Sequence, residues 1–189
     1  MMQNTAPSFV PDRTYFFTVR LQDARADLLV RHIGLLRDAT RLCRNRWAFD
    51  IPAAVILPSR LHMIWTLPDG DGDVAKRWRL IKSGFSRHVP IPPDLSTGHA
   101  GRRDKGIWQR GLWEHLVRDQ DDFDRHAHVI RAAPVQAGLV KRASDWPYSS
   151  LHSQPRQGLR TTVPVPSVQD RAAASTSSRT AVTAASRNC

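Results

Sequence analysis

The sequence predicts an α+β fold of the ferredoxin-like kind, with an antiparallel sheet and helices on one face. Three observations lead to this prediction. The periodic segments of the first 90 residues follow the order strand, helix, strand, strand, helix. Two of these strands are separated only by a short Pro58-Ser59 turn, which is typical of an antiparallel hairpin. The length of 189 residues is enough for one domain with a real core.

The first strand and helix follow directly from residue type and spacing. Residues 15–21 are rich in aromatic and β-branched side chains, which favour a strand. Apolar residues then recur at helical spacing from Leu28 to Leu42, so we expect an amphipathic helix there.

The hairpin and the second helix come next. Residues 47–57 and 61–67 predict its two strands. The turn-forming run of residues 69–73 ends the hairpin, and Asp73 supplies an N-cap for a helix that continues through Phe85.

The second half of the chain is less regular. Residues 90–105 form a loop rich in Pro, Gly and Arg, and residues 107–117 are expected to be extended or irregular. Residues 119–137 predict a helix, with Gly138 as its C-cap. One face of this helix is apolar and consists of Phe123, Ala127 and Ile130.

Composition divides the chain into three parts. Residues 1–12 are expected to be a flexible arm, and residues 13–152 a single domain. From residue 153 to 189, Ser, Thr, Ala, Pro, Gln and Arg dominate without apolar periodicity, which predicts a disordered, low-complexity tail.

Charge and cysteine content limit the function classes. Lys and Arg outnumber Asp and Glu by 28 to 17, which gives a net charge of +11, and most of the excess is arginine. Arginine forks suit phosphate oxygens, so the sequence favours a polyanionic partner; a basic, arginine-preferring proteome would give the same composition. Cys43 and Cys189 provide neither a disulfide framework nor a zinc site. Without an apolar run of membrane-spanning length or a signal-peptide pattern, we expect a cytoplasmic protein with no membrane partner.

The most informative segment is residues 57–68, which predict a buried strand containing His62. Arg60 lies two residues earlier, and side chains two apart in a strand point to the same face. Residues 60 and 62 could therefore reach one ion or one phosphate together. The pair is similar to a His-hydrophobe-His metal site whose first histidine has been lost.

Five motifs in one order resemble the REP-associated tyrosine transposases, which are HUH single-strand transposases with a Y1 transposase domain. The resemblance covers roughly residues 13–152. The motifs are Arg13-Thr-Tyr-Phe-Phe-Thr-Val19, Leu61-His-Met-Ile-Trp-Thr-Leu-Pro68, Arg77-Trp-Arg-Leu-Ile-Lys-Ser83, Gly106-Ile-Trp-Gln-Arg110 with Trp113-Glu-His115, and Asp145-Trp-Pro-Tyr-Ser-Ser150.

The resemblance implies a ferredoxin-like core that cleaves single-stranded DNA beside a hairpin. In such enzymes two histidines of the central strand and a polar residue of a later helix hold a divalent metal, Mg or Mn. A tyrosine on that helix attacks the scissile phosphate and stores the bond as a phosphotyrosine.

Residue by residue, this chain departs from that pattern. The two histidine positions are Arg60 and His62. With Pro134-Val135 as the anchor of the alignment, the tyrosine position is Val129 and the metal-binding position of the helix is Ala133. Arginine cannot ligate a divalent ion, and valine has no nucleophilic atom. We therefore expect a disrupted metal site, no cofactor and lost catalysis, with His62 as the remnant ligand.

Two function classes remain. The first is a catalytically inactive transposase-family protein, either a decayed copy or a domesticated relic, that binds single-stranded or hairpin DNA. The alternative is an active metal-dependent single-strand endonuclease or transposase with an unrecognised nucleophile. Tyr148 lies in the Trp-Pro-Tyr-Ser-Ser motif, where we expect a structural role.

Basic residues interleaved with tryptophans are the candidates for DNA contact, because they suit backbone charge and base stacking. The alternative is that the tryptophans belong to the core and the charges to a solvated face. Scattered histidines, among them His115, His126 and His128, could also form a new metal set, although their spacing is not that of a zinc site. The candidates for DNA contact are Arg77, Arg79, Lys82, Arg87, Arg102, Arg103, Lys105, Trp108, Arg110 and Trp113.

Overall fold

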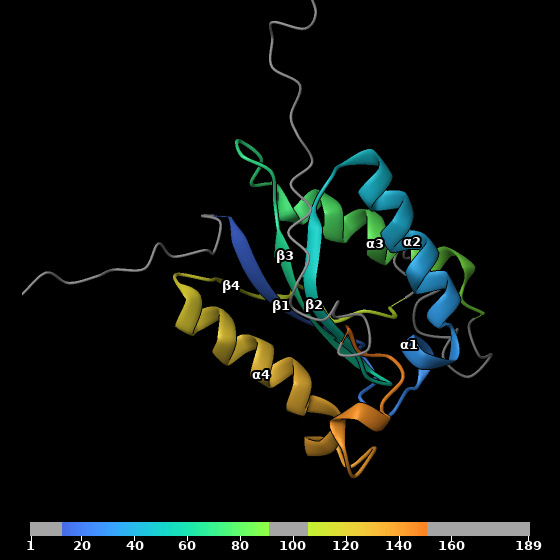
Figure 1. The fold of residues 1–189 in the computed structure, drawn as a ribbon. Helices are drawn as coiled ribbons and strands as arrows, with labels where there is room; N and C mark the ends of the chain where they lie inside the picture. Colours follow the sequence, from blue (N-terminus) through green and yellow to red (C-terminus); the bar gives the residue numbers. More distant parts are fainter. Residues whose placement is uncertain (1–12, 91–105, 151–189) are drawn as a thin grey trace, which may run out of the picture. The chain divides into compact units, whose positions relative to one another are not determined.

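The computed structural model describes residues 13–90 and 106–150. Within them lies a four-stranded antiparallel sheet of order β2-β3-β1-β4 (Figure 1). The predicted arm, the loop at 91–105 and the tail fall outside the described residues. The strands are β1 (Thr14–Arg20), β2 (Asp50–Ile56), β3 (Arg60–Thr66) and β4 (Trp113–Leu116).

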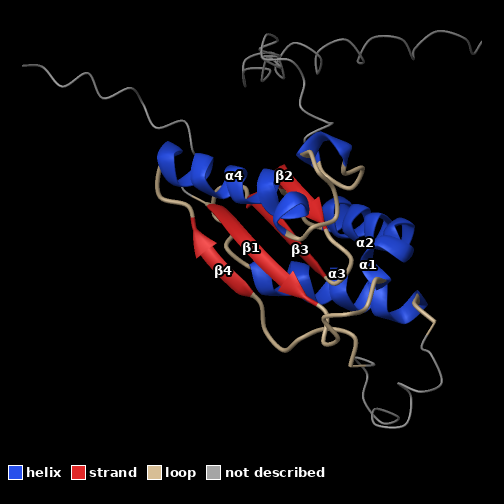
Figure 2. Cartoon of the chain, turned by 90° about the horizontal axis from the view of Figure 1, so that it is seen from below, coloured by secondary structure: helices blue, strands red, loops and turns tan. Residues whose placement is uncertain are grey.

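Helices cover both faces of the sheet, as Figures 1 and 2 show. The α+β class is confirmed, but the expectation of helices on one face is not met, because α4 lies on the face opposite to α2 and α3. The physical reason is β3, where Leu61–Trp65 are all buried, so that both faces of this central strand need a cover. The helices are α1 (Leu28–Arg31), α2 (Ile33–Arg46), α3 (Val74–His88), α4 (Gln120–Gln136) and a 3-10 turn at Ala143–Asp145.

The face under α2 and α3 carries the larger core. The rings of Trp65 and Trp78 stack with centroids 4.3 Å apart, and Phe17 lies 4.8 Å from Trp65. The two helices approach closely, since a Cβ at Gly84 would lie 3.2 Å from the Cβ of Ala39. A glycine at this crossing therefore allows α3 to pack directly on α2.

The face under α4 carries a second, smaller core. Phe16 of β1 and Ile64 of β3 are buried there against Ile130 and Ala133 of α4. Phe123 and Ala127 pack on the same cluster, which confirms the predicted apolar face of this helix. This second core fixes α4 across β2 and β3.

Local signals placed the start of α3 and the end of α4 correctly. The Asp73 carboxylate accepts the backbone N–H of Lys76 at 2.9 Å, so this residue is the N-cap of α3 as predicted. Gly138 adopts φ of 68°, the left-handed conformation that favours glycine after a helix. The predicted helix over 28–42 is interrupted at His32, where α1 ends and α2 begins.

The last described segment adds to the free edge of β2. The Ile56 N–H donates to the carbonyl of Tyr148 at 2.8 Å, and the Ala54 N–H donates to Ser150 Oγ at 2.9 Å. The Trp146 indole N–H donates to the Ile56 carbonyl at 2.9 Å. This geometry gives the Trp-Pro-Tyr-Ser-Ser motif an edge-covering role. None of the helices in the described part of the chain is long and apolar enough to cross a membrane.

Candidate nucleic-acid interface

The candidate site lies on the α4 side of the sheet, where β1 and β3 run side by side. Their register places Thr18 opposite His62, and Arg20 opposite Arg60. His62 Nδ1 lies 2.9 Å from Thr18 Oγ1, and only 9% of the residue is exposed. Burial, which has the largest effect, and the charges of Arg60 and Arg20 together lower the pKa of His62 to about 4. His62 is therefore a neutral imidazole at pH 7.

Helix α4 faces this strand pair. The two helix positions that the family resemblance singles out are Val129 and Ala133, and both side chains are apolar. Val129 is 41% exposed and Ala133 is buried at 3%. Neither side chain has an atom that can bind a metal ion, and Arg60 is a permanent cation. Of these four residues, His62 alone offers a metal ligand, so they do not fit a divalent ion, and Val129 cannot act as a nucleophile.

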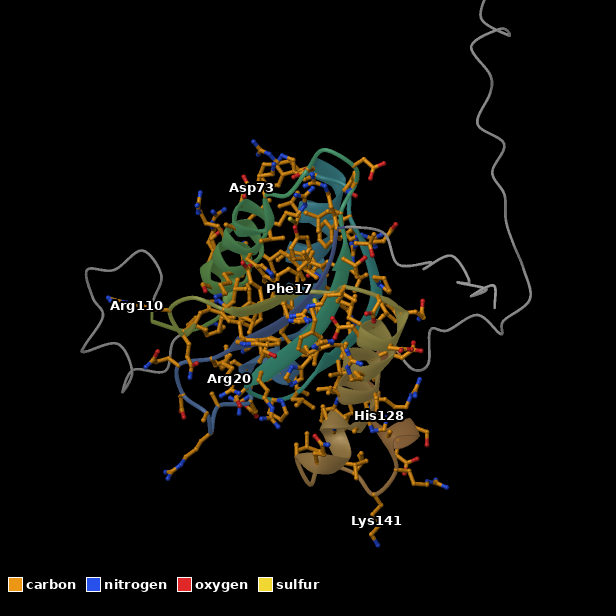
Figure 3. All side chains as sticks on the ribbon, turned by 90° about the vertical axis from the view of Figure 1, so that its left-hand side faces the viewer. Phe17, Arg20, Asp73, Arg110, His128 and Lys141 are labelled. Carbon is orange, nitrogen blue, oxygen red and sulfur yellow. The ribbon has the colours of Figure 1, made fainter. Side chains whose placement is uncertain are left out.

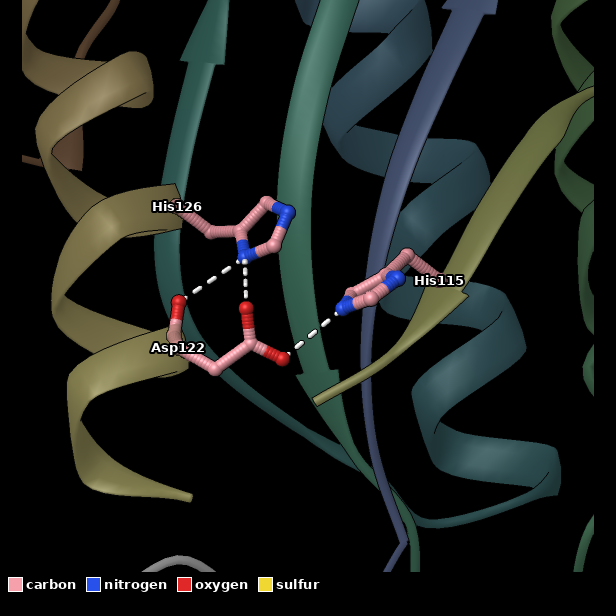
Figure 4. Close-up of side chains that lie close together, drawn as sticks. All are labelled: His115, Asp122 and His126. Carbon is pink, nitrogen blue, oxygen red and sulfur yellow. Dashed lines mark hydrogen bonds and ion pairs between the residues drawn. The ribbon is translucent and has the colours of Figure 1, made fainter. Parts of the chain in front are cut away.

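A different cluster joins β4 to α4 (Figure 4). The buried carboxylate of Asp122 accepts hydrogen bonds from His115 Nε2 at 2.8 Å, from the Arg118 N–H at 3.1 Å and from the Arg125 guanidinium at 3.1 Å. Burial raises the pKa of Asp122, but the hydrogen bonds from His115, Arg118 and Arg125 outweigh burial and hold it below its usual range. Asp122 is therefore a fixed negative charge.

The same cluster has the ligand types of a metal site, because atoms of His115, Asp122 and His126 lie within 4.8 Å of one another. The hydrogen bonds argue for another role. His126 Nδ1 lies 2.8 Å from the main-chain oxygen of Asp122 and 3.3 Å from its carboxylate. Since both neighbours are acceptors, this nitrogen carries a proton and has no lone pair for a metal. The three residues form a hydrogen-bonded link between strand and helix.

The rings of this cluster continue into an aromatic row across the sheet face. His126 packs on Phe16 at 4.5 Å and on His115 at 4.7 Å, and Trp113 stacks parallel to His115 at 5.9 Å. Trp113 ends the row and is 53% exposed. An exposed indole supported from below by packed rings is a suitable surface on which a nucleobase could stack.

Arg77 is one of the predicted DNA contacts, but its side chain is not accessible to DNA. The structure buries it completely, with 0% exposure, and its guanidinium donates to both carboxylate oxygens of Asp71 at 2.7 and 3.0 Å. It also donates to the Ala48 carbonyl at 3.0 Å. Helical spacing could not show this, because a buried arginine needs a distant carboxylate and carbonyl that only the fold supplies.

Trp108 is also a core residue. Its indole N–H donates to Ser86 Oγ at 2.9 Å, and its ring packs on Phe85 at 5.3 Å. Lys82 covers this ring at 5.8 Å, and its ammonium group donates to the Gly111 carbonyl at 2.8 Å. Burial lowers the pKa of Lys82. For Trp108 the alternative reading, a core tryptophan, is the correct one.

The remaining candidates are divided in space. Arg110 and Trp113 are exposed in and before β4, whereas Arg79 and Arg87 are exposed on α3, which covers the opposite face of the sheet. Among the described residues, the structure therefore does not bring the predicted basic side chains together on one surface. Arg102, Arg103 and Lys105 lie outside the described residues.

Two residues of the site were missed by sequence reasoning. Arg20 ends β1 and joins Arg60 only through the register of the two strands. Asp122 precedes His126 by four residues, a helical spacing that could have indicated the pair, but its bond to His115 needs the packing of α4 on β4.

Comparison with known proteins agrees with this architecture. No family model matches the chain. Two curated proteins resemble it over about 150 residues. The "REP-associated tyrosine transposase" of Escherichia coli (strain K12) is 38% identical over 151 residues, which cover 80% of this chain and 84% of the relative. The "Putative REP-associated tyrosine transposase" of Haemophilus influenzae (strain ATCC 51907 / DSM 11121 / KW20 / Rd) is 36% identical over 152 residues, with 80% and 86% coverage.

A solved structure, described as that of a REP-associated tyrosine transposase bound to a REP hairpin, shares the fold with a TM-score of 0.66. It is 34% identical and covers 88% of this chain and 96% of its own. The antiparallel sheet and the strand-and-helix site thus define a protein of the α+β, transposase-like class. The chain belongs to the family of REP-associated tyrosine transposases. The resemblance found in the sequence is confirmed.

Proposed function

We propose that this protein binds single-stranded or hairpin DNA and that its tyrosine-based cleavage chemistry is lost. One observation carries the proposal. On the sheet face where β3 meets α4, the residues at the four chemical positions are Arg60, His62, Val129 and Ala133, which together lack a nucleophile and a metal ligand set. No cofactor is needed for the binding that remains.

Support for DNA as the partner comes from the relative and from the surface. The solved relative is bound to a REP hairpin, and it aligns with 88% of this chain. The chain carries a net charge of +11, which favours a polyanion. Arg110, Trp113, Arg20 and Arg60 place cationic and aromatic groups on β1, β3 and β4 or beside them. We propose that the protein acts in the cytoplasm.

The proposal is tested with purified full-length protein and an end-labelled single-stranded hairpin oligonucleotide. The mixture is incubated with manganese or with a chelator and examined on native and on denaturing gels. We expect a shifted band under both conditions and neither cleavage nor a covalent adduct.

Two results would contradict the proposal. Absence of a shift at low salt would exclude the DNA partner. Metal-dependent cleavage would show that an unrecognised nucleophile works. A Tyr148→Phe variant then reports whether that residue supplies the nucleophile; persistence of cleavage in it would point to water.

A further inference from the structure

A pocket of about 360 Å³ opens where the end of β1 meets the turn between β2 and β3. Its polar lining consists of Arg20, Ser59, Arg60 and Gln109, and its apolar walls include Leu57 and Leu139. Figure 3 labels Arg20 at the end of β1. Gln109 is held next to this strand end, since its N–H donates to the Arg20 carbonyl at 3.0 Å.

The two arginines of this pocket lie opposite each other on neighbouring strands, and neither forms an ion pair with a described acidic residue. Arg20 and Arg60 are direct partners in the antiparallel register of β1 and β3, where like charges repel. Within residues 13–90 and 106–150, no ion pair involves either guanidinium, whereas Arg31, Arg77 and Arg125 each meet an aspartate. The described residues that line the pocket include no Asp or Glu. An anion between the two side chains would remove the repulsion.

Three carbonyl groups at the neighbouring helix end are already hydrogen-bonded. Ala137 and Leu139 line the pocket after the last turn of α4, where free carbonyl groups would repel a negative charge. The carbonyl groups of Ala133, Pro134 and Val135 are occupied, because they accept the N–H groups of the three residues that follow the helix. The carbonyl of Ser59 is also occupied, by the Leu21 N–H at 2.8 Å.

We infer that Arg20 and Arg60 together hold one backbone phosphate of the bound DNA strand. Guanidinium groups donate paired hydrogen bonds to phosphate oxygens, and the Ser59 hydroxyl and Gln109 amide offer additional donors at the rim. The site fixes the position of the strand on the sheet and carries no base specificity. This inference rests on the proposed DNA-binding function and names the place where the backbone is held.

The experiment compares Arg20→Gln, Arg60→Gln and the double variant with wild type. Arg37→Gln is the matched control, because Arg37 is exposed on α2, on the opposite face of the sheet. Affinity for the hairpin oligonucleotide is measured by fluorescence anisotropy over a series of salt concentrations. We expect the double variant to bind at least tenfold more weakly and to lose about 0.7 to 0.9 from the slope of log K against log salt, the value of one phosphate contact. The control keeps the wild-type slope.

A second measurement locates the phosphate. Single backbone phosphates of the oligonucleotide are replaced in turn by neutral methylphosphonates. One of these replacements should weaken the binding of wild type, and the same replacement should leave the affinity of the double variant unchanged. If wild type binds the hairpin and the double variant keeps the same salt slope and the same methylphosphonate profile, the phosphate site is wrong while the proposed function stands.

A third arm separates the inference from the proposed function. If wild type does not bind the hairpin, the proposed function fails, and with it the assignment of a DNA phosphate. Titration with inorganic phosphate, followed through the Arg Nε–H resonances, then shows whether the pocket takes a free phosphate instead.

Thermal unfolding without DNA provides the fold control. Loss of one of two repelling charges should leave Tm unchanged or raise it, and a large fall in Tm would mean that the pair is structural.

Discussion

Arg60 and His62 occupy alternate positions of one strand, and their different chemistry decides what the site can do. Arg60 brings a permanent positive charge to a position where the family resemblance implies a histidine ligand. His62 stays neutral because it is buried and lies near two cations. The strand thus keeps positive charge beside the site, and we propose that it no longer holds a metal ion.

The low pKa of His62 predicts how stability depends on pH. The folded value of about 4 lies below the ordinary value of 6.5, so the unfolded chain takes up this proton more readily. His62 therefore contributes stability that is complete above pH 6.5 and is lost as the pH falls towards 4. An NMR titration of the imidazole should give this low value, and Arg20→Gln should raise it because a nearby cation is removed. A titration midpoint near 6.5 in wild type would disprove the burial of His62.

Trp113 is the residue on which base stacking can be tested. We expect Trp113→Ala to weaken binding of the hairpin oligonucleotide by roughly tenfold, because one stacked base contributes about 1 to 3 kcal/mol. Leu42→Ala is the control, since Leu42 is another exposed apolar side chain and lies on α2. Equal affinities of the two variants in fluorescence anisotropy would exclude Trp113 from the interface.

At the level of elements, α4 depends on the cluster around Asp122 for its attachment to β4. Asp122→Asn removes a buried charge that accepts from His115, Arg118 and Arg125, so we expect a loss of roughly 2 kcal/mol or more in the free energy of unfolding. Its depressed pKa means that this stability is present at neutral pH and is lost as the pH falls below the ordinary aspartate value. Urea unfolding at pH 7 and at pH 3 measures both effects. Zinc that raises Tm of wild type and not of the variant would show instead that the cluster binds metal.

The start of α3 depends on a second buried charge. Asp71→Asn leaves the guanidinium of Arg77 without its carboxylate, and we expect a loss of about 3 kcal/mol in the free energy of unfolding. Asp69→Asn is the matched control, because Asp69 is exposed in the same turn. Denaturant unfolding that gives the same midpoint for both variants would contradict this role of Arg77.

At the level of the whole molecule, the fold keeps the strand and the helix on which the family resemblance places the chemistry, and we propose that the side chains there have changed. Val129 and Ala133 still lie on α4, and that helix still packs across β2 and β3. If this fold is intact, restoring the metal ligands and the tyrosine should restore cleavage of DNA.

Restoring the implied residues tests this. We expect Val129→Tyr alone to form no covalent adduct, because Arg60 still excludes the metal. The combined variant Arg60→His, Val129→Tyr and Ala133→Asn should form a manganese-dependent adduct with the labelled hairpin, seen as a shifted band on a denaturing protein gel. Ala133 is buried, so circular dichroism must first show that the combined variant folds. A folded, DNA-binding combined variant without adduct would show that further parts of the site have been lost.

The sequence by itself determined the order of strands and helices, the N-cap Asp73, the left-handed Gly138 after α4 and the family, and it predicts that Arg60, Val129 and Ala133 stand at the chemical positions. These features are local: they follow from periodicity, turn residues and short motifs. Only the tertiary structure decided which of the predicted side chains are exposed and which lie next to one another. It buried Arg77 and Trp108, placed α4 on the second sheet face, and brought Arg20 beside Arg60. Each of these depends on partners far away along the chain, because burial and strand register are set by packing, which spacing along one element does not encode.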